Sequence, residues 1–415
     1  MTATHTPAPA HRLRDVRYEI RGELARRAHA IEAAGRTVIK LNIGNPGLFG
    51  FETPEHLRAA VAQGLPASEA YCHQQGLAQA REAIAHQQQR RGAPGAHAER
   101  VWLGNGVSEL IDISLRALLD SGDEVLIPAP DYPLWTAATV LNGGVAVHYP
   151  CLAQNGFVPD VDAIEALVTP RTRALVVINP NNPTGAVYPL ATLLALADLA
   201  TRHGLVLMAD EIYDGLLYDD AVFEPIACLA PDALCLSFGG LSKVHRACGY
   251  RAGWVSLSGA LQHSGAYQHA LDLLSALRLC ANVAAQWAIA PALTGPDTST
   301  ALTRPGGRLC ETRRVVIEAC ASSAALRLVS PSGALYAFPG VDPELCPGFD
   351  DHAFALELLE RESVLLVPGS SFNVVYRNHL RLTLLPDAVL MADVFARIER
   401  TLARQLSPSL QRHVA

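Results

Sequence analysis

Lysine is almost absent from this chain. Lys40 and Lys243 are its only lysines in 415 residues, and every other one of the 33 basic residues is arginine. Lysine is ordinarily common in soluble proteins, and a coding bias is the simplest explanation for its general replacement. An arginine supplies charge but not a reactive primary amine. Each remaining lysine is therefore a candidate for chemistry that needs an amine.

Other absences exclude whole classes of protein. Charged residues make up only 18%, too few for a disordered or coiled-coil chain, and half of the residues are hydrophobic. With a net charge of −7 and no basic run of five residues, we expect no nucleic-acid partner. No apolar stretch reaches membrane-spanning length and the first residues lack a signal-peptide core, so we expect a cytoplasmic protein without membrane contact.

The nine cysteines show no pairing pattern. None forms a CxxC motif, their number is odd, and the 15 histidines are scattered along the chain. We therefore expect reduced thiols and no metal site.

From about residue 100, apolar segments alternate with helical ones. Ala174–Ile178 and Leu205–Ala209 are almost unbroken apolar runs, which suit strands buried on both faces of a mostly parallel sheet. Helices are predicted between strands, as at Ser108–Leu119 and Pro189–His203. The pattern predicts an α/β fold with a doubly wound sheet. The seven predicted strands are 101–103, 124–128, 145–149, 174–178, 205–209, 234–238 and 252–257.

The two ends of the chain are predicted to form a smaller α+β domain. Between them, Thr53-Pro54 is expected to begin the first helix of the large domain, with Thr53 as its cap. The elements predicted for the smaller domain are helices at 16–34, 351–362 and 388–405 and strands at 37–42, 332–338, 364–367 and 380–384. We expect four parts: a flexible arm at 1–15, a segment at 16–52 that joins the small domain, a large domain at 53–299 with the central sheet, and a small domain at 300–415.

Polar residues stand where predicted strands end, which is where open α/β sheets bind ligands. Asn182 lies in NPNNPTG, Asp210 follows a buried strand, and Lys243 lies in GGLSK. Each alone has an ordinary interpretation: a turn residue, a helix cap or ion-pair partner, and a surface lysine. The turn GNGVSEL before a helix suits a phosphate or an ordinary strand–helix connection. Its Glu109 breaks the GxGxxG pattern and disfavours a dinucleotide.

The ordered set of motifs resembles the class I aminotransferases, pyridoxal-phosphate enzymes of fold type I. The resemblance extends from about Val16 to Pro386 and implies a large domain with a mostly parallel sheet plus a smaller domain. Within the family, YEIRG, GNGVSELI, PAPDYPLWTAA and NPNNPTGAVY resemble bacterial alanine (glutamate–pyruvate) aminotransferases. The motifs that carry the resemblance are LNIGNP, AYCHQQGL, GNGVSEL, PAPDYPLW, INPNNPTG, ADEIYD, GLSK, GYRAGW and HLRLTLLP.

The resemblance implies roles around the cofactor, pyridoxal 5'-phosphate. Lys243 matches the lysine that bonds the cofactor aldehyde and then moves the substrate proton. Asp210 matches the carboxylate at the ring nitrogen, Asn182 and Tyr213 match donors to the ring oxygen, and Tyr132 matches the ring-stacking position. The positions that match phosphate ligands are Gly106, Val107, Ser108, Ser242, Arg251 and Tyr71.

The matching tyrosine at Tyr71 comes from the neighbouring subunit in the family, which implies a homodimer with active sites at the interface; simple packing is the alternative. Arg381 matches the arginine that grips the substrate α-carboxylate, helped by Asn182 and Gly44. Tyr18 and Arg21 resemble residues that cover the substrate. Arg21 is a candidate for the distal carboxylate of glutamate, or else a solvated helix cation.

The resemblance implies reversible amino transfer between alanine and 2-oxoglutarate by a ping-pong route. Another amino donor, such as valine or an aromatic amino acid, and a lyase or oxidative deaminase remain alternatives. Val244, His245 and Gly47-Leu48 depart from the usual family residues, which leaves the amino-acid preference open. His245 has two interpretations, a pH-sensitive group beside the site or an ordinary loop histidine.

Overall fold

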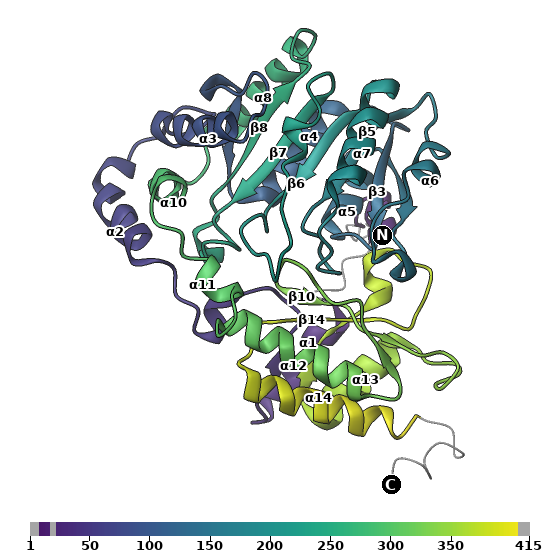
Figure 1. Cartoon of the computed structure of the whole chain (residues 1–415). Coiled ribbons are helices and arrows are strands. Elements are labelled where there is room, and N and C mark those ends of the chain that lie inside the picture. The colour runs from purple at the N-terminus through teal and green to yellow at the C-terminus, as the bar shows by residue number, and fades with distance from the viewer. Residues whose placement is uncertain (1–7, 17–21, 406–415) are drawn as a thin grey trace, which may run out of the picture.

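A seven-stranded sheet forms the centre of the larger of two units in the computed structural model, which describes residues 8–16 and 22–405 (Figure 1). All seven strands coincide with predicted ones, in the order β2-β8-β7-β6-β5-β3-β4. Only β8 runs antiparallel to its neighbours; every other pairing is parallel. The strands are β2 (Val101–Gly104), β3 (Glu124–Ala129), β4 (Val145–Pro150), β5 (Thr172–Ile178), β6 (Val206–Asp210), β7 (Leu234–Gly240) and β8 (Gly253–Gly259).

Helices cover both faces of this sheet, and the alternation of side chains along the strands explains why. In β3, Val125 and Ile127 belong to the core shared with one set of helices, whereas Leu126 belongs to the core on the opposite face. The first set is α4 (Val107–Leu118), α5 (Leu134–Leu141) and α8 (Gly265–Leu277); the second is α6 (Val161–Glu165) and α7 (Leu190–His203). The sheet is therefore doubly wound, as predicted.

Four helices pack beside the β2–β8 side of the sheet. They are α2 (Glu55–Gly64), α3 (Ala78–Arg90), α9 (Val283–Gln286) and α10 (Ile289–Thr294). The prediction that Thr53 caps α2 is wrong. Pro54 occupies the cap position, and the Thr53 hydroxyl instead donates to the Arg246 carbonyl at 3.2 Å. That bond joins the start of α2 to the loop after β7.

The smaller unit combines both ends of the chain. Strand β1 (Ile39–Lys40) pairs with β12 (Val364–Leu365) in parallel, and α1 (Glu23–Ala33) packs against α13 (Asp351–Glu362). A three-stranded sheet in the order β10-β14-β13 completes this unit together with α12 and α14. The bounds of the latter elements are β10 (Tyr336–Ala337), β13 (Val367–Pro368), β14 (Leu380–Thr383), α12 (Arg308–Ser322) and α14 (Ala388–Leu402).

Some elements of the smaller unit are shorter than predicted. Helix 16–34 is observed only from Glu23, with a short 3-10 helix at His11–Asp15 before it; residues 17–21 lie outside the described part. The strands predicted at 37–42 and 332–338 pair over two residues each. Because α1 and β1 contact the C-terminal elements, we propose that residues 16–52 and 300–415 form one domain, which lies beside a second domain of residues 53–299.

Two kinds of feature are absent from the residues that the structure describes. No helix within 8–16 and 22–405 is long and apolar enough to cross a membrane. The same ranges contain no group of three or more His, Cys, Asp or Glu side chains placed to hold a metal ion. All nine cysteines carry free thiols.

Candidate active site

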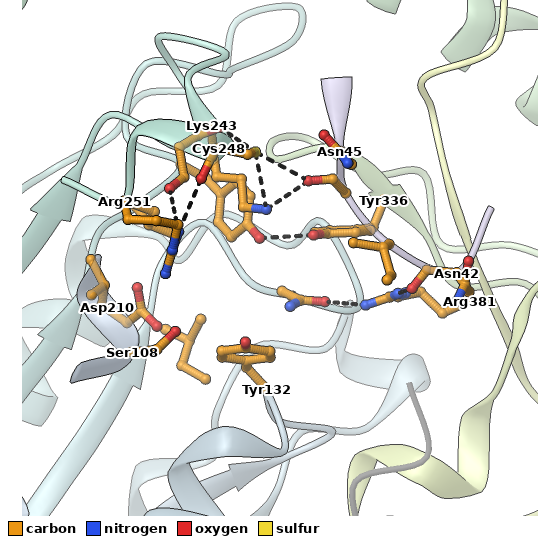
Figure 2. A pocket seen from close by; sticks show the side chains of 18 of the residues that line it. Asn42, Asn45, Ser108, Tyr132, Asp210, Lys243, Cys248, Arg251, Tyr336 and Arg381 are labelled. Atoms are coloured by element: carbon orange, nitrogen blue, oxygen red, sulfur yellow. Dashed lines mark hydrogen bonds between the residues drawn. The ribbon is translucent and has the colours of Figure 1, made fainter. Parts of the chain in front are cut away.

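A cavity of about 570 Å³ lies where the sheet meets the smaller unit (Figure 2). Strands β2, β3, β5, β6 and β7 run in the same direction, so the segments that follow them converge at one edge. The smaller unit supplies the opposite wall. The lining residues are Asn42–Asn45, Val107, Ser108, Tyr132, Ile178, Asn182, Asp210, Ile212, Tyr213, Ser242, Lys243, Cys248, Gly249, Arg251, Tyr336 and Arg381.

Most of the residues predicted for the site line this cavity, including Lys243, Asp210 and Arg381. Gly106 adjoins it at the start of α4 without lining it. Tyr71 does not line it either, and its side chain is 77% exposed. Tyr18 and Arg21 lie outside the described residues.

Asp210 is buried at the end of β6 and keeps one oxygen unpaired. Its Oδ2 accepts a hydrogen bond from Trp135 Nε1 at 3.1 Å, whereas its Oδ1 has no hydrogen-bond partner. Burial raises the pKa of Asp210 to about 6, against the lowering effects of Trp135, a backbone N–H and Lys243. A cationic donor placed at Oδ1 would satisfy this oxygen and favour the ionised carboxylate.

Lys243 points into the cavity from the loop after β7. Its Nζ donates to the Gly44 carbonyl at 2.7 Å and lies 4.0 Å from Cys248 Sγ. Lys40, in contrast, pairs with Glu32 at 2.8 Å on the smaller unit and does not line the cavity. Of the two lysines, only Lys243 is placed to react with a ligand in the cavity.

A cradle for an anion forms where α4 begins. Gly106 has φ of 84°, and a Cβ atom there would lie 2.3 Å from Arg251 Nη2, so this position requires glycine. Arg251 Nη2 donates to the Asn105 carbonyl at 3.2 Å, and Nη1 donates to Ser242 Oγ at 3.4 Å. The first backbone N–H groups of α4 at Val107 and Ser108 complete a site of the kind that holds phosphate.

Arg381 occupies the opposite side of the cavity from Arg251 (Figure 2). The residue is 2% exposed, and its guanidinium carbon lies over the rings of Tyr336 and Phe372, at 4.6 and 5.1 Å from their centroids. Nη1 donates to Asn182 Oδ1 at 3.2 Å, and Nη2 donates to the Asn42 carbonyl. A buried guanidinium packed against two aromatic rings suits planar recognition of a carboxylate.

Several lining or supporting residues were not predicted. Tyr336 reaches the cavity from β10 and forms a 2.9 Å hydrogen bond with Tyr213 through the two hydroxyl groups. Cys248 donates to the Ser242 carbonyl at 2.8 Å, and Trp135 holds Asp210. Trp135 lies in the quoted motif PAPDYPLW, which could have drawn attention to it, but nothing local distinguishes Tyr336 from other apolar strand positions.

His245 does not line the cavity. Its partly buried ring has a pKa lowered to about 4, mainly by burial. It is therefore neutral at ordinary pH, which favours the interpretation as a loop histidine over that of a pH-sensitive group.

Asp131, next to Tyr132, is a second buried carboxyl group. Oδ2 accepts from the Thr136 hydroxyl at 2.7 Å and Oδ1 accepts from Asn373 Nδ2 at 2.9 Å, which ties the sheet edge to the loop before β14. Burial raises its pKa to about 7. Since an unfolded aspartate titrates near pH 4, the folded state holds a proton that the unfolded chain releases between about pH 4 and 7. Stability from this group is therefore full below pH 4 and is lost as pH rises toward 7.

We expect Asp131→Asn to flatten this dependence. The Asn amide can donate to Thr136 and its oxygen can accept from Asn373, while the Thr136 hydroxyl turns toward His148 Nε2, 2.9 Å away. Urea unfolding at pH 5 and pH 8 should show a larger loss of stability for the unaltered protein than for the variant. The exposed Asp232→Asn is the control. Equal losses in the unaltered protein and Asp131→Asn would contradict the assignment.

Fold and cavity together define a fold type I architecture in which a lysine and a buried carboxylate face one cavity beside the start of a helix. The model of the family "Aminotransferase class I and II" matches residues 36–398. An alanine aminotransferase of Mycobacterium tuberculosis is 48% identical over 95% of this chain and 91% of its own length. The glutamate-pyruvate aminotransferase AlaA of Escherichia coli is 46% identical over 93% and 96%.

Comparison with a solved structure supports the same family. An aminotransferase from Escherichia coli superimposes with a TM-score of 0.94 at 45% identity, covering 96% of this chain and 98% of that one. The chain belongs to the class I and II aminotransferase family and is an enzyme of that family.

Proposed function

We propose that this enzyme binds pyridoxal 5'-phosphate and reversibly transfers the amino group between alanine and 2-oxoglutarate, giving pyruvate and glutamate. The family and fold are those of pyridoxal-phosphate enzymes. The substrates are proposed because two relatives at 46–48% identity are named for alanine or for glutamate and pyruvate. Amino-acid and 2-oxo-acid substrates suit a cavity with a carboxylate-binding arginine.

One observation carries the cofactor proposal, namely the buried Asp210 oxygen without a partner. It fits a protonated pyridine nitrogen, and the Gly106–Arg251 cradle fits the phosphate of the same molecule. Bound there, the cofactor would supply an electron sink for charge that develops on the substrate. Val107, Ser108, Ser242 and Arg251 would hold the phosphate.

The other lining residues then have separate tasks. Lys243 would bond the cofactor carbonyl through its amine and afterwards move the proton from the substrate α-carbon, as a general base and acid. Tyr213 and Asn182 would donate to the ring oxygen, and Tyr132 would stack on the ring. Arg381 would hold the α-carboxylate with Asn182 and Gly44, and this grip from the smaller unit would draw the two units together.

We further propose a homodimer. Tyr71 is far more exposed than a tyrosine in a packed interior, and exposure suits a side chain that reaches the phosphate site of a second copy. Among the described residues that line the cavity, the cations are Lys243, Arg251 and Arg381, each with a task already. Arg21 therefore remains the proposed partner of the distal carboxylate of glutamate, and Tyr18 is proposed to help cover the substrate.

Absorbance spectroscopy tests the proposed function. The purified protein should be yellow, alanine should convert its spectrum to that of the pyridoxamine form, and 2-oxoglutarate should restore it. A colourless protein would overturn the cofactor proposal. If valine or an aromatic donor acts much faster than alanine, the substrate proposal fails. If no 2-oxo acid restores the spectrum, the enzyme is a lyase or an oxidative deaminase and not a transaminase.

A further inference from the structure

Tyr336 stands between the two ends of the cavity. Its hydroxyl is 2.9 Å from that of Tyr213, and the two rings meet edge to face with centroids 5.7 Å apart. Its ring face lies 4.6 Å from the guanidinium carbon of Arg381. One buried side chain therefore contacts both the proposed donor to the cofactor ring oxygen and the proposed holder of the substrate carboxylate (Figure 2).

The hydroxyl of Tyr336 also packs against Gly44, the residue whose carbonyl accepts the hydrogen bond from Lys243. A Cβ atom on Gly44 would lie 2.4 Å from this oxygen, so the phenol packs directly on the Gly44 backbone. The Gly44 carbonyl accepts the hydrogen bond from Lys243 Nζ. Any larger residue at position 44 would displace the phenol from Tyr213.

Either hydroxyl could donate in the bond between the two tyrosines, and proton counting sets its direction once the proposed cofactor is bound. Burial, and next the adjacent Tyr336, raise the pKa of Tyr213 well above its usual value, so this hydroxyl keeps its one proton. If Tyr213 donates that proton to the cofactor ring oxygen, it can only accept from Tyr336. Hydrogen bonds in such a chain strengthen one another in a low-dielectric site.

We propose that Tyr336 is a positioning residue with two separable functions. Its hydroxyl donates to Tyr213 and so strengthens the donation of Tyr213 to the cofactor, and its ring holds Arg381 in the plane needed for the substrate carboxylate. The inference rests on the proposed function. The groups facing this pair that titrate or carry charge are Asp210, Lys243, Arg381 and Tyr132.

The hydroxyl function has a spectroscopic signature. Negative charge on the ring oxygen favours a proton on the neighbouring nitrogen of Lys243, and a donor to that oxygen opposes it. Tyr336→Phe removes the second link of the chain, so the absorbance of the bound cofactor should titrate at a pH higher by about 0.5 to 1 unit. The ring remains over Arg381, so the KM for alanine should stay within about twofold.

Tyr218 offers a matched control. Its hydroxyl is also buried and donates to the Ala334 carbonyl at 3.0 Å, and Arg313 lies 5.0 Å from its ring, but it does not line the cavity. Tyr218→Phe should leave the titration and KM unchanged. Tyr336→Leu, which also removes the ring, should raise the KM for alanine about tenfold.

Three outcomes separate this inference from the proposed function. A shifted titration of the cofactor absorbance in Tyr336→Phe, together with an unshifted one in Tyr218→Phe, supports the inference. A yellow, active Tyr336→Phe protein that titrates like the unaltered enzyme would overturn the inference and leave the proposed function intact. Failure of the unaltered protein to take up the cofactor would overturn both.

Discussion

Replacing Lys243 by arginine is expected to lower turnover by roughly 10⁴-fold or more, the scale seen when a covalent catalytic group is lost. Arginine keeps the positive charge and can still donate to the Gly44 carbonyl, which accepts from Lys243 at 2.7 Å. A guanidinium, however, stays protonated and cannot form the bond to the cofactor carbonyl. Steady-state rates with alanine and 2-oxoglutarate measure the effect.

The second lysine of the chain supplies a matched control. Lys40→Arg keeps the ion pair with Glu32 on a partly exposed surface, so its turnover should equal that of the unaltered protein. Turnover in Lys243→Arg within about tenfold of that value would remove Lys243 from the reaction.

Arg381→Lys should weaken amino-acid binding more than it slows the chemical step. Lysine keeps the charge but loses the planar fork that packs against Tyr336 and Phe372. The loss of one charge-assisted hydrogen bond predicts an increase in KM for alanine of roughly 10- to 100-fold, with a smaller change in kcat. Initial rates over a range of alanine concentrations separate the two parameters.

Arg313→Lys tests whether any buried arginine would behave in this way. Arg313 is also buried and bonds the Pro331 carbonyl and Asp219, but it does not line the cavity. Its replacement should lower stability and leave KM unchanged. An unchanged KM in Arg381→Lys would exclude Arg381 from substrate binding.

The central sheet could be predicted because its strands are buried in regular patterns. The apolar run at Ala174–Ile178 is shielded on both faces, so strand β5 is evident without tertiary information. The strands of the smaller unit pair over only two to four residues, and contacts with distant segments decide where they begin. Helix 16–34 was overextended because periodicity does not show where a helix starts.

The parts of the site that could be predicted are those in which a polar residue directly follows a predicted strand. Asp210 and Lys243 each follow a predicted strand, and parallel topology brings such ends together. Tyr336 and Asn42 reach the cavity from opposite ends of the chain, and no local pattern shows that they meet beside Arg381. The turn at Gly106 is ambiguous in the sequence, because its contact with Arg251 is made between segments far apart in the chain.

Reduction of the purified holoenzyme with borohydride, followed by tryptic digestion and mass spectrometry, tests most directly the claim that Lys243 bonds the cofactor. Reduction makes that bond permanent and blocks cleavage at the lysine. We predict the pyridoxyl phosphate mass on the peptide spanning residues 203–246, at Lys243, and none at Lys40. A label at Lys40, or a yellow protein that acquires no label after reduction, would contradict the account.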